Sequence, residues 1–525
     1  MARPSLRRRL IAALLALLVA HIAVPSLGAE RRLTREYLVR RAQEVAKAIS
    51  SARGLPLLAP VRADLLTRSE LVDLVRRRTN EETPPEEIRA EGILLERLGV
   101  IESAADYEQQ IYDMFEEQIA GLYDPDDRTL YVLTDLYPDE ADLTLWHEIV
   151  HALQDQNFHV GERQDALEDD GDRSLAYAAI CEGDATLTSS VLQLGVGWDA
   201  LAWLFPDDVE SIRAMFVPTD PDGSGVPTEL LEVLSFPYVE GVVFVRRQWE
   251  QGGIPAIDDL FRRPPESTEQ VIHTEKYGGA DSPVRLRFGD PESAFPGRAV
   301  RYEDTMGEFV IRVWLGMALP RESAAKAAAG WGGDRIALVV PSAAPGAGCA
   351  SGAVPLDDRL WACGASPTCG ADADVRLGEA EGWAVWATTW DPAGEDHPSG
   401  ATGEADEFRD SSIEALKELA GPTESDAPEA RDQLIEPAPT ESQPRAEARG
   451  SDADSLAGVA EEDIEVDDEG RRTWLADGEF AVAAVRSDGL TVNIVIGPPG
   501  RAADAIPLLD ELAAAVQADR TTPQP

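Results

Sequence analysis

Apolar and polar positions alternate along the first part of the chain mostly with the period of an α-helix. Apolar residues recur there every three or four positions, which predicts amphipathic helices. The stretch V-R-A-D-L-L-T alternates with a period of two instead and predicts a short strand. We expect helices at residues 34–53, 69–79, 84–98, 103–120, 139–157 and 174–194.

A β-hairpin is predicted just before the helix at 139–157. The segment G-L-Y-D-P-D-D-R-T-L-Y-V-L, which starts at Gly121, places two short apolar runs on either side of D-P-D-D. Aspartate and proline in this order favour a tight turn. The following residues, 207–320, read as mostly helical and are broken by P-T-D-P-D-G-S-G-V-P and by R-R-P-P-E-S-T.

The pattern changes to strands near residue 331. R-I-A-L-V-V and W-A-V-W-A-T-T-W predict strands, and E-F-R-D-S-S-I-E-A-L-K-E-L-A predicts a helix that stops before Gly421. Residues 421–470 are rich in proline, acidic residues, serine and alanine, so they cannot bury a core and are predicted to be disordered. Beyond them, a hairpin with an S-D-G turn precedes a helix at about 502–517.

These elements predict an α+β protein with a mainly helical part and a smaller mixed part. The mainly helical domain, which contains the small β-hairpin, is expected at residues 29–330. A small α+β domain is expected to be made of residues 331–420 and 471–520, interrupted by a disordered acidic linker at 421–470. Residues 1–28 are expected to belong to neither domain, because they have the pattern of a signal peptide.

The N-terminus has the pattern of a secretory signal peptide. The basic stretch M-A-R-P-S-L-R-R-R precedes a short apolar run, and small residues allow cleavage after Gly28. The pattern predicts a secreted or periplasmic protein; the alternative is an anchor formed by an uncleaved signal. No other apolar run is long enough to cross a membrane, so no stable span is expected after cleavage.

Charge and cysteine content narrow the class of protein further. The formal net charge is −49, which argues against a nucleic-acid partner because phosphates require a basic surface. Export permits disulfides, and Cys349, Cys363 and Cys369 lie close together in a Gly/Ala/Pro-rich segment. One bridge among these three is expected, and the sequence leaves the pairing open.

Two histidines stand one helical turn apart in T-L-W-H-E-I-V-H-A-L-Q-D-Q, although the chain has only 6 histidines. On a helix, His147 and His151 share one face and can bind one metal ion, while Glu148 can contact a water on that ion. Zinc lowers the pKa of such a water, and the glutamate takes its proton. The pattern predicts zinc ligands at His147 and His151 and a general base at Glu148. The alternative is a hydrogen-bonded histidine pair in the core.

A catalytic zinc site needs a third protein ligand. We expect Glu182, in A-Y-A-A-I-C-E-G-D-A-T-L, because a carboxylate among small and apolar neighbours is costly unless it is paired or binds a metal. Pairing with an arginine is the alternative reading of Glu182. His159, eight residues after His151, is a second candidate ligand. Cys181 offers a thiolate, but a free buried cysteine is the preferred reading.

These motifs resemble the gluzincin group of zinc metallopeptidases, to which thermolysin belongs. H-E-I-V-H-A-L-Q-D-Q-N-F resembles more closely a set of exported bacterial metallopeptidases with an H-E-L-x-H-A-L-Q-D-Q-x-F helix. Those proteins also carry G-x-Y-D-P, E-G-D-A, P-P-x-S-T-E-Q-x-x-H and G-W-G-G-D-R, which stand here at 121–125, 182–185, 264–273 and 330–335. The resemblance implies a zincin-like catalytic domain and a hydrolase that uses zinc.

One position departs from the gluzincin pattern. Many gluzincins have an aspartate four residues after the ligand glutamate, where it orients a ligand histidine; this chain has Thr186 there, and Asp184 comes two residues earlier. Gln154 or Asp155, on the helix of the histidines, is therefore expected to orient a ligand instead.

A peptidase also needs a group that stabilises the developing oxyanion. His273 and Tyr277 in V-I-H-T-E-K-Y are the candidates, because they would share a face of a helix that follows a rigid P-P-E-S-T turn. The alternative for His273 is a structural hydrogen bond in a turn. The edge of the hairpin at 121–133 could hold an extended peptide.

The sequence thus predicts an exported zinc metallopeptidase that acts on a peptide or protein substrate, and it names neither the cleavage site nor an oligomeric state. Two alternatives stay open: a non-catalytic zinc-binding envelope or interaction protein of the same fold, and a zinc hydrolase of a non-peptide bond.

Overall fold

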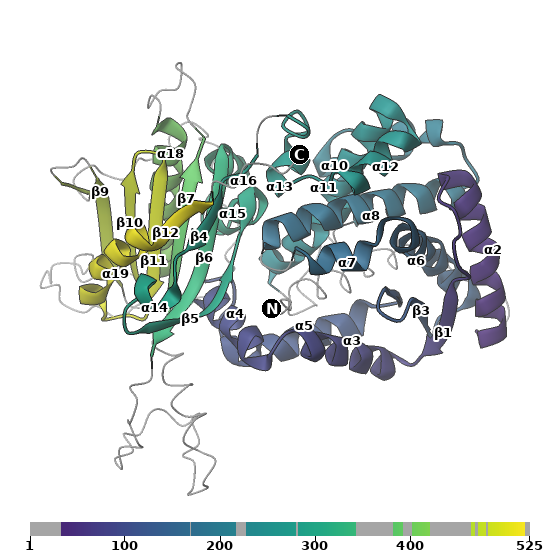
Figure 1. Cartoon of the computed structure of the whole chain (residues 1–525), viewed down its shortest axis with the longest axis horizontal. Helices are drawn as coiled ribbons and strands as arrows, with labels where there is room; N and C mark the ends of the chain where they lie inside the picture. Colours follow the sequence, from purple (N-terminus) through teal and green to yellow (C-terminus); the bar gives the residue numbers. More distant parts are fainter. Residues whose placement is uncertain are drawn as a thin grey trace, which may run out of the picture.

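The computed structural model divides into a helical part and a sheet part that lie side by side along the longest axis (Figure 1). The expected signal peptide and the three clustered cysteines lie outside the described residues. The structure describes residues 33–167, 170–216, 227–279, 282–342, 382–391, 402–420, 464–467, 471–478 and 481–519.

The helical part follows the predicted pattern closely at its start. The helices expected at 34–53, 69–79, 84–98, 139–157 and 174–194 are all present within a few residues of the predicted ends. Its elements are α2 (Arg35–Arg53), α3 (Arg68–Glu82), α4 (Pro85–Arg97), η2 (Ala104–Asp106), α5 (Tyr107–Gln118), α6 (Pro138–Phe158), α7 (Val160–Asp165), α8 (Gly171–Gln193), η3 (Trp198–Ala200), α9 (Leu201–Leu204), α10 (Val209–Phe216), α11 (Thr228–Gly252), α12 (Ile254–Arg262) and α13 (Thr268–Ile272).

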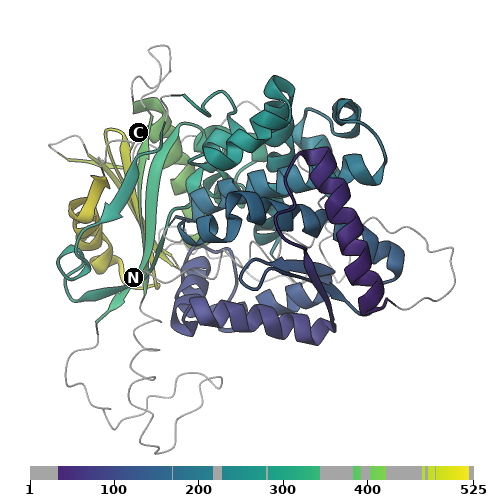
Figure 2. The ribbon, with the colours of Figure 1, turned by 45° about the vertical axis from the view of Figure 1, so that its right-hand side comes forward.

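A three-stranded sheet lies beside α6, with the strand order β1-β3-β2. Strands β2 (Gly121–Asp124) and β3 (Thr129–Leu133) pair antiparallel, which confirms the predicted hairpin, and β1 (Arg62–Leu66) pairs parallel to β3. Because β2 pairs only with β3, it forms one edge of this sheet. The N-terminal helix α2 lies at the end of the helical part that is farthest from the sheet part in Figure 1, and it comes to the front in Figure 2.

Two glycines let α8 and α11 approach each other closely. A Cβ atom at Gly183 would lie 2.4 Å from the carbonyl oxygen of Gly241, and one at Gly241 would lie 2.3 Å from that of Ala179. Such distances are too short for a real Cβ atom, so any larger residue would push the helices apart. The glycine of the E-G-D-A motif thus serves helix packing.

The sheet part is built on seven antiparallel strands in the order β5-β6-β7-β11-β10-β9-β8. Strand β7 pairs with β11, so residues from both sides of the acidic segment contribute to one sheet. The strands are β4 (Arg285–Phe288), β5 (Arg298–Asp304), β6 (Trp331–Pro341), β7 (Trp383–Trp390), β8 (Glu465–Val466), β9 (Arg472–Asp477), β10 (Val482–Asp488), β11 (Thr491–Gly497) and β12 (Val516–Asp519), of which β12 pairs with β4 alone.

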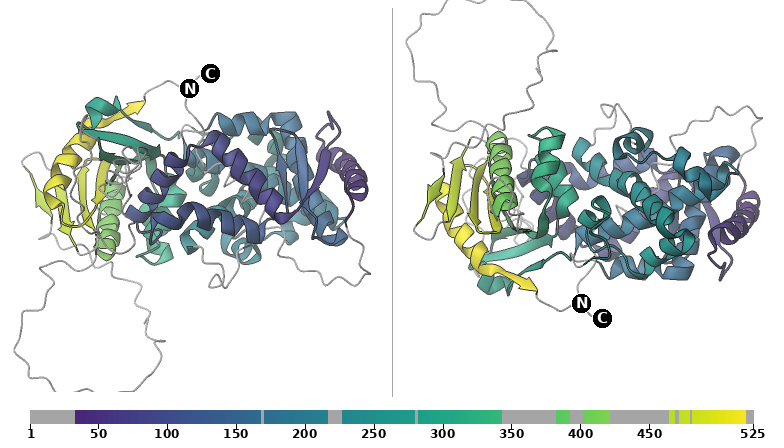
Figure 3. Two further views of the ribbon diagram at one scale, coloured as in Figure 1. Left: turned by 90° about the horizontal axis from the view of Figure 1, so that it is seen from below. Right: turned by 90° about the horizontal axis from the view of Figure 1, so that it is seen from above.

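Helices cover both faces of the large sheet. One cluster packs Trp386 and Ile494 of the sheet against Phe408 of α18 and Trp314 of α15, on the face toward the helical part. The other packs Val495 and further sheet residues against α19 on the outer face (Figure 3). The covering helices are α14 (Pro291–Ala294), α15 (Gly307–Leu315), α16 (Arg321–Ala328), α18 (Gly403–Ala420) and α19 (Ala502–Ala515).

The mixture of helices and separate antiparallel sheets confirms the predicted α+β class. Two details differ from expectation. Residues 285–304 contain two strands inside a stretch read as mostly helical, and β5 joins the large sheet by pairing with β6. Strand β8 lies in the segment predicted to be disordered, and it forms because Glu465 pairs with Thr473 of β9. Within 421–470, the structure describes only residues 464–467.

None of the helices in the described ranges is long and apolar enough to span a membrane.

Candidate metal centre

Helix α6 carries the two histidines of the H-E-I-V-H motif. The helix begins at Pro138, where proline costs no hydrogen bond, and the Glu140 carboxylate accepts from the backbone N–H of Tyr137. It ends at Phe158, because His159 turns into the left-handed region at φ 56°. His147 and His151 lie one turn apart inside this helix and face α8.

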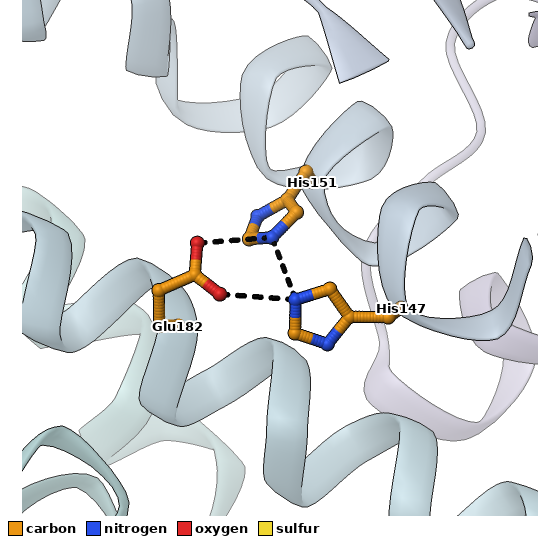
Figure 4. Close-up of side chains that lie close together, drawn as sticks. All are labelled: His147, His151 and Glu182. Atoms are coloured by element: carbon orange, nitrogen blue, oxygen red, sulfur yellow. Dashed lines mark hydrogen bonds and ion pairs between the residues drawn. The ribbon is translucent and has the colours of Figure 1, made fainter. Parts of the chain in front are cut away.

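Glu182 of α8 meets both histidines (Figure 4). Its Oε2 lies 2.9 Å from Nε2 of His147, and its Oε1 lies 3.2 Å from Nε2 of His151. The two Nε2 atoms are 3.1 Å apart. One ligand atom from each of the three residues lies within 4.8 Å of the others, so this group could hold a metal ion.

Burial and charge make these three groups suitable for holding a cation. His147 is 1% exposed and Glu182 is 3% exposed, so neither is stabilised by bulk water. Burial opposes the charged form of Glu182, but the facing imidazoles lower its pKa to about 2. Burial likewise opposes a charge on His151, but the Glu182 carboxylate raises the His151 pKa to about 9. Without a metal, the cluster holds a proton in its place.

Glu148 lies next to this cluster and is not one of its three members. Its Oε2 accepts a hydrogen bond of 2.9 Å from the backbone N–H of Tyr123, in the edge strand β2. Burial raises the pKa of Glu148, while the neighbouring charges of His151 and His147 oppose that rise. The carboxylate is therefore anchored through one oxygen and sits beside the ligand atoms.

Tyr238 of α11 also contacts the cluster, although no sequence motif points to it. Its ring stacks on the ring of His147, with 6.2 Å between centroids and 26° between planes. Its buried hydroxyl lies near the Glu182 carboxylate without completing a hydrogen bond of normal geometry. Burial, together with the charges of Glu182 and Glu148, raises the pKa of this hydroxyl, so it stays protonated. No local motif marks this tyrosine, because the close contact of α8 and α11 brings it in.

Gln154 is the residue that orients His151, one of the candidate ligands. Its Oε1 lies 2.9 Å from Nδ1 of His151, on the side of the ring away from Glu182. Asp155, the other expected candidate, accepts instead from the hydroxyl of Tyr123 at 3.0 Å. Hydrogen bonds of this kind set the ring orientation and the tautomer of metal-binding histidines.

The structure places His273 and Tyr277 in other surroundings. Helix α13 ends at Ile272, before either residue, so the expected shared helix face does not form. Nε2 of His273 lies 2.9 Å from Oε1 of Glu308, and the Tyr277 hydroxyl donates to the backbone oxygen of Arg263 at 2.7 Å. None of these contacts involves the metal cluster.

The two other candidate ligands, His159 and Cys181, lie outside the cluster. The His159 side chain is 65% exposed, and its nearest acidic partner is Glu162 at 3.9 Å. Cys181 is a free, buried cysteine whose pKa is raised by burial, and it is not a member of the metal cluster.

Comparison of the chain with models of protein families, with curated proteins and with solved structures finds no match.

Proposed function

We propose that this chain is an exported zinc-dependent metallopeptidase in which His147, His151 and Glu182 hold the metal and Glu148 is the general base. One observation carries the proposal: a buried carboxylate, Glu148, lies directly beside a His/His/Glu ligand group without being part of it. A purely structural metal site has no need for this second acidic group.

The donor set fits zinc. Two imidazole nitrogens and one carboxylate oxygen are a ligand set typical of catalytic zinc, where three protein ligands leave a further position open. The negative charge of Glu182 raises the His151 pKa to about 9, so the cluster binds a proton strongly. The same negative charge favours binding of a divalent cation. When bound, zinc would acidify a water molecule and polarise a carbonyl group.

The protein's own groups would carry the proton transfers. Glu148 accepts a proton from the nucleophilic water and passes it to the amine that leaves. Its raised pKa suits this double role, because a base with a pKa closer to neutrality also gives its proton back. The hydrogen bond from Tyr123 fixes one carboxylate oxygen and leaves the other available.

Tyr238 is the best-placed group to stabilise the oxyanion, in place of His273 and Tyr277. Its hydroxyl remains protonated and faces the ligand Glu182, so it can donate a hydrogen bond. A donor held in place by helix packing needs little rearrangement during the reaction, which is what makes such groups effective.

A non-catalytic protein with a structural metal is the second candidate. The observation in its favour is burial: Glu148 and Glu182 are each 3% exposed, and a substrate must reach them. Hydrolysis of a non-peptide bond is the third candidate, and a peptide digest separates it from the peptidase.

The test is a digest of a peptide library by the full chain loaded with zinc. We expect cleavage by the wild type, loss of cleavage with a chelator, and recovery with added zinc. Glu148→Gln should bind zinc normally and cleave roughly 10²–10⁴-fold more slowly, since it lacks only the base. Glu162→Gln is the matched control, because that side chain is 78% exposed. If loaded wild-type protein cleaves no peptide, the peptidase proposal fails and the structural or non-peptide readings gain.

A further inference from the structure

The Gln154 amide has a single consistent orientation. Its Nε2 donates to the backbone oxygen of Cys181 at 3.0 Å and to Oδ2 of Asp184 at 3.0 Å. Both amide hydrogens are therefore used, and a flipped amide would set its oxygen against two acceptors. Oε1 must therefore face His151, so Nδ1 of that ring carries a hydrogen and Nε2 is the nitrogen that points toward Glu182.

Asp184 is in turn held by a buried arginine from the N-terminal helix. Nε of Arg53 donates to Oδ1 of Asp184 at 2.7 Å, and both side chains are 0% exposed. Thr188 donates to the same oxygen at 3.1 Å. Nη1 of Arg53 continues the chain to Asp258 of α12, at 2.7 Å. The contacts thus run from α12 through α2 and α8 to the ligand on α6.

We propose that Arg53, Asp184 and Gln154 act as a positioning relay that fixes the metal-binding nitrogen of His151, so that the N-terminal helix α2 controls metal affinity. The inference rests on the proposed function only in taking the His/His/Glu group as a metal site. Arg53 and Asp184 are 131 residues apart in sequence, and their contact exists only in the folded chain.

The contacts fit a relay better than a purely structural ion pair. A carboxylate such as Asp184 only accepts hydrogen bonds, so it dictates the direction of the Gln154 amide next to it. The second histidine offers a contrast, because Nδ1 of His147 is buried without a hydrogen-bond partner in the described structure. Of these two histidines, His151 alone is oriented through its Nδ1.

Affinity for zinc, measured by competition with a chelator on folded protein, is the first test. Gln154→Leu and Asp184→Asn should each weaken zinc binding by about 10–100-fold, the usual effect of residues behind a metal ligand. The double variant should bind zinc no more weakly than Gln154→Leu alone, because the two residues act in series. Losses that add in the double variant would overturn the relay.

A matched pair of variants on α12 tests the outer end of the relay without changing a fully buried residue. Asp258 contacts Arg53 and its side chain is 22% exposed, whereas Asp259 is 48% exposed and pairs with Arg262. Asp258→Asn should weaken zinc binding by roughly twofold to tenfold, below the range for direct partners of the histidine. Asp259→Asn should change nothing. Equal affinities for these two variants, both folded by circular dichroism, would contradict control from α2.

These outcomes are separate from those of the peptidase assay. The readout is metal affinity, so the relay stands or falls whether or not the protein cleaves peptides. Conversely, loss of zinc affinity in Gln154→Leu alongside an inactive wild type would support the relay and reject the proposed function.

Discussion

Two buried carboxylates, Glu182 in the helical part and Asp334 in the sheet part, have opposite electrostatic character. Glu182 faces two imidazoles, and its pKa is lowered to about 2. Asp334, in the G-W-G-G-D-R motif, accepts from the backbone N–H groups of Met306 and Gly307 and from the indoles of Trp331 and Trp386. Burial nevertheless raises the Asp334 pKa to about 6.

The difference shows that neutral donors do not replace a counter-charge in a protein interior. Four N–H groups satisfy the oxygens of Asp334 but only partly offset the cost of burying its charge. The imidazoles beside Glu182 can become charged, and a cation can take the place of their proton. Asp334 is therefore suited to tie the start of α15 to two tryptophans of the sheet, and Glu182 is suited to bind a metal.

The sharpest test of this contrast removes each carboxylate in turn. Glu182→Gln should lower zinc affinity by more than the 10–100-fold expected of residues behind a ligand, because it removes a ligand itself. Asp334→Ala should leave zinc binding unchanged but destabilise the fold by about 3 kcal/mol or more, since four donors lose their acceptor. Elemental analysis and urea unfolding measure the two effects.

The control for the second variant is Asp488→Ala, at an exposed end of the same sheet, which should cost less than about 0.5 kcal/mol. A full zinc content in Glu182→Gln, or in His147→Ala, would refute the assignment of the metal ligands.

A second contrast concerns two groups proposed for the oxyanion. Tyr238→Phe should lower kcat by about 100-fold with unchanged zinc content, because it removes one donor. His273→Ala should leave kcat nearly unchanged and instead destabilise the protein by about 1 kcal/mol, since His273 pairs with Glu308. Steady-state kinetics on each variant, with a melting curve, decides between them. A large fall in kcat for His273→Ala would restore the role that the sequence predicted.

A third contrast concerns pH dependence. Zinc must displace the proton of His151, whose pKa is raised to about 9, so affinity should rise about tenfold per pH unit between pH 6.5 and 9 and then level off. In the metal-free protein, stability from this proton is present below pH 6.5 and lost as pH rises through 9. Affinity that is flat across this window would contradict the coupling.

The Asp334 carboxylate gives a pH dependence of the same sign in a lower pH window. Its raised pKa means that the protonated form stabilises the fold below pH 3.8 and that this stability is lost as pH rises through about 6. The stability difference between wild type and Asp334→Asn should therefore grow in favour of wild type as pH falls from 7 toward 4.

The local pattern of apolar, polar and turn residues predicted much of the secondary structure. Helices α2, α6 and α8 and the β2–β3 hairpin follow from apolar periodicity and turn residues, which act over a few positions. The strands at Arg285–Phe288 and Arg298–Asp304 were not predicted. The first has only four residues, the second does not alternate regularly, and both become strands by pairing with distant segments.

The sequence by itself determined that His147, Glu148 and His151 share a helix turn, because spacing along a helix decides which side chains are neighbours. It also singled out Glu182 through the cost of burying a lone carboxylate. Only the tertiary structure decided that Tyr238 covers His147 and that Gln154 rather than Asp155 orients His151. It also decided that Arg53 holds Asp184 behind Gln154. These contacts depend on how four helices pack, and the close approach of α8 and α11 at Gly183 and Gly241 leaves no signal in the spacing of the residues it brings together.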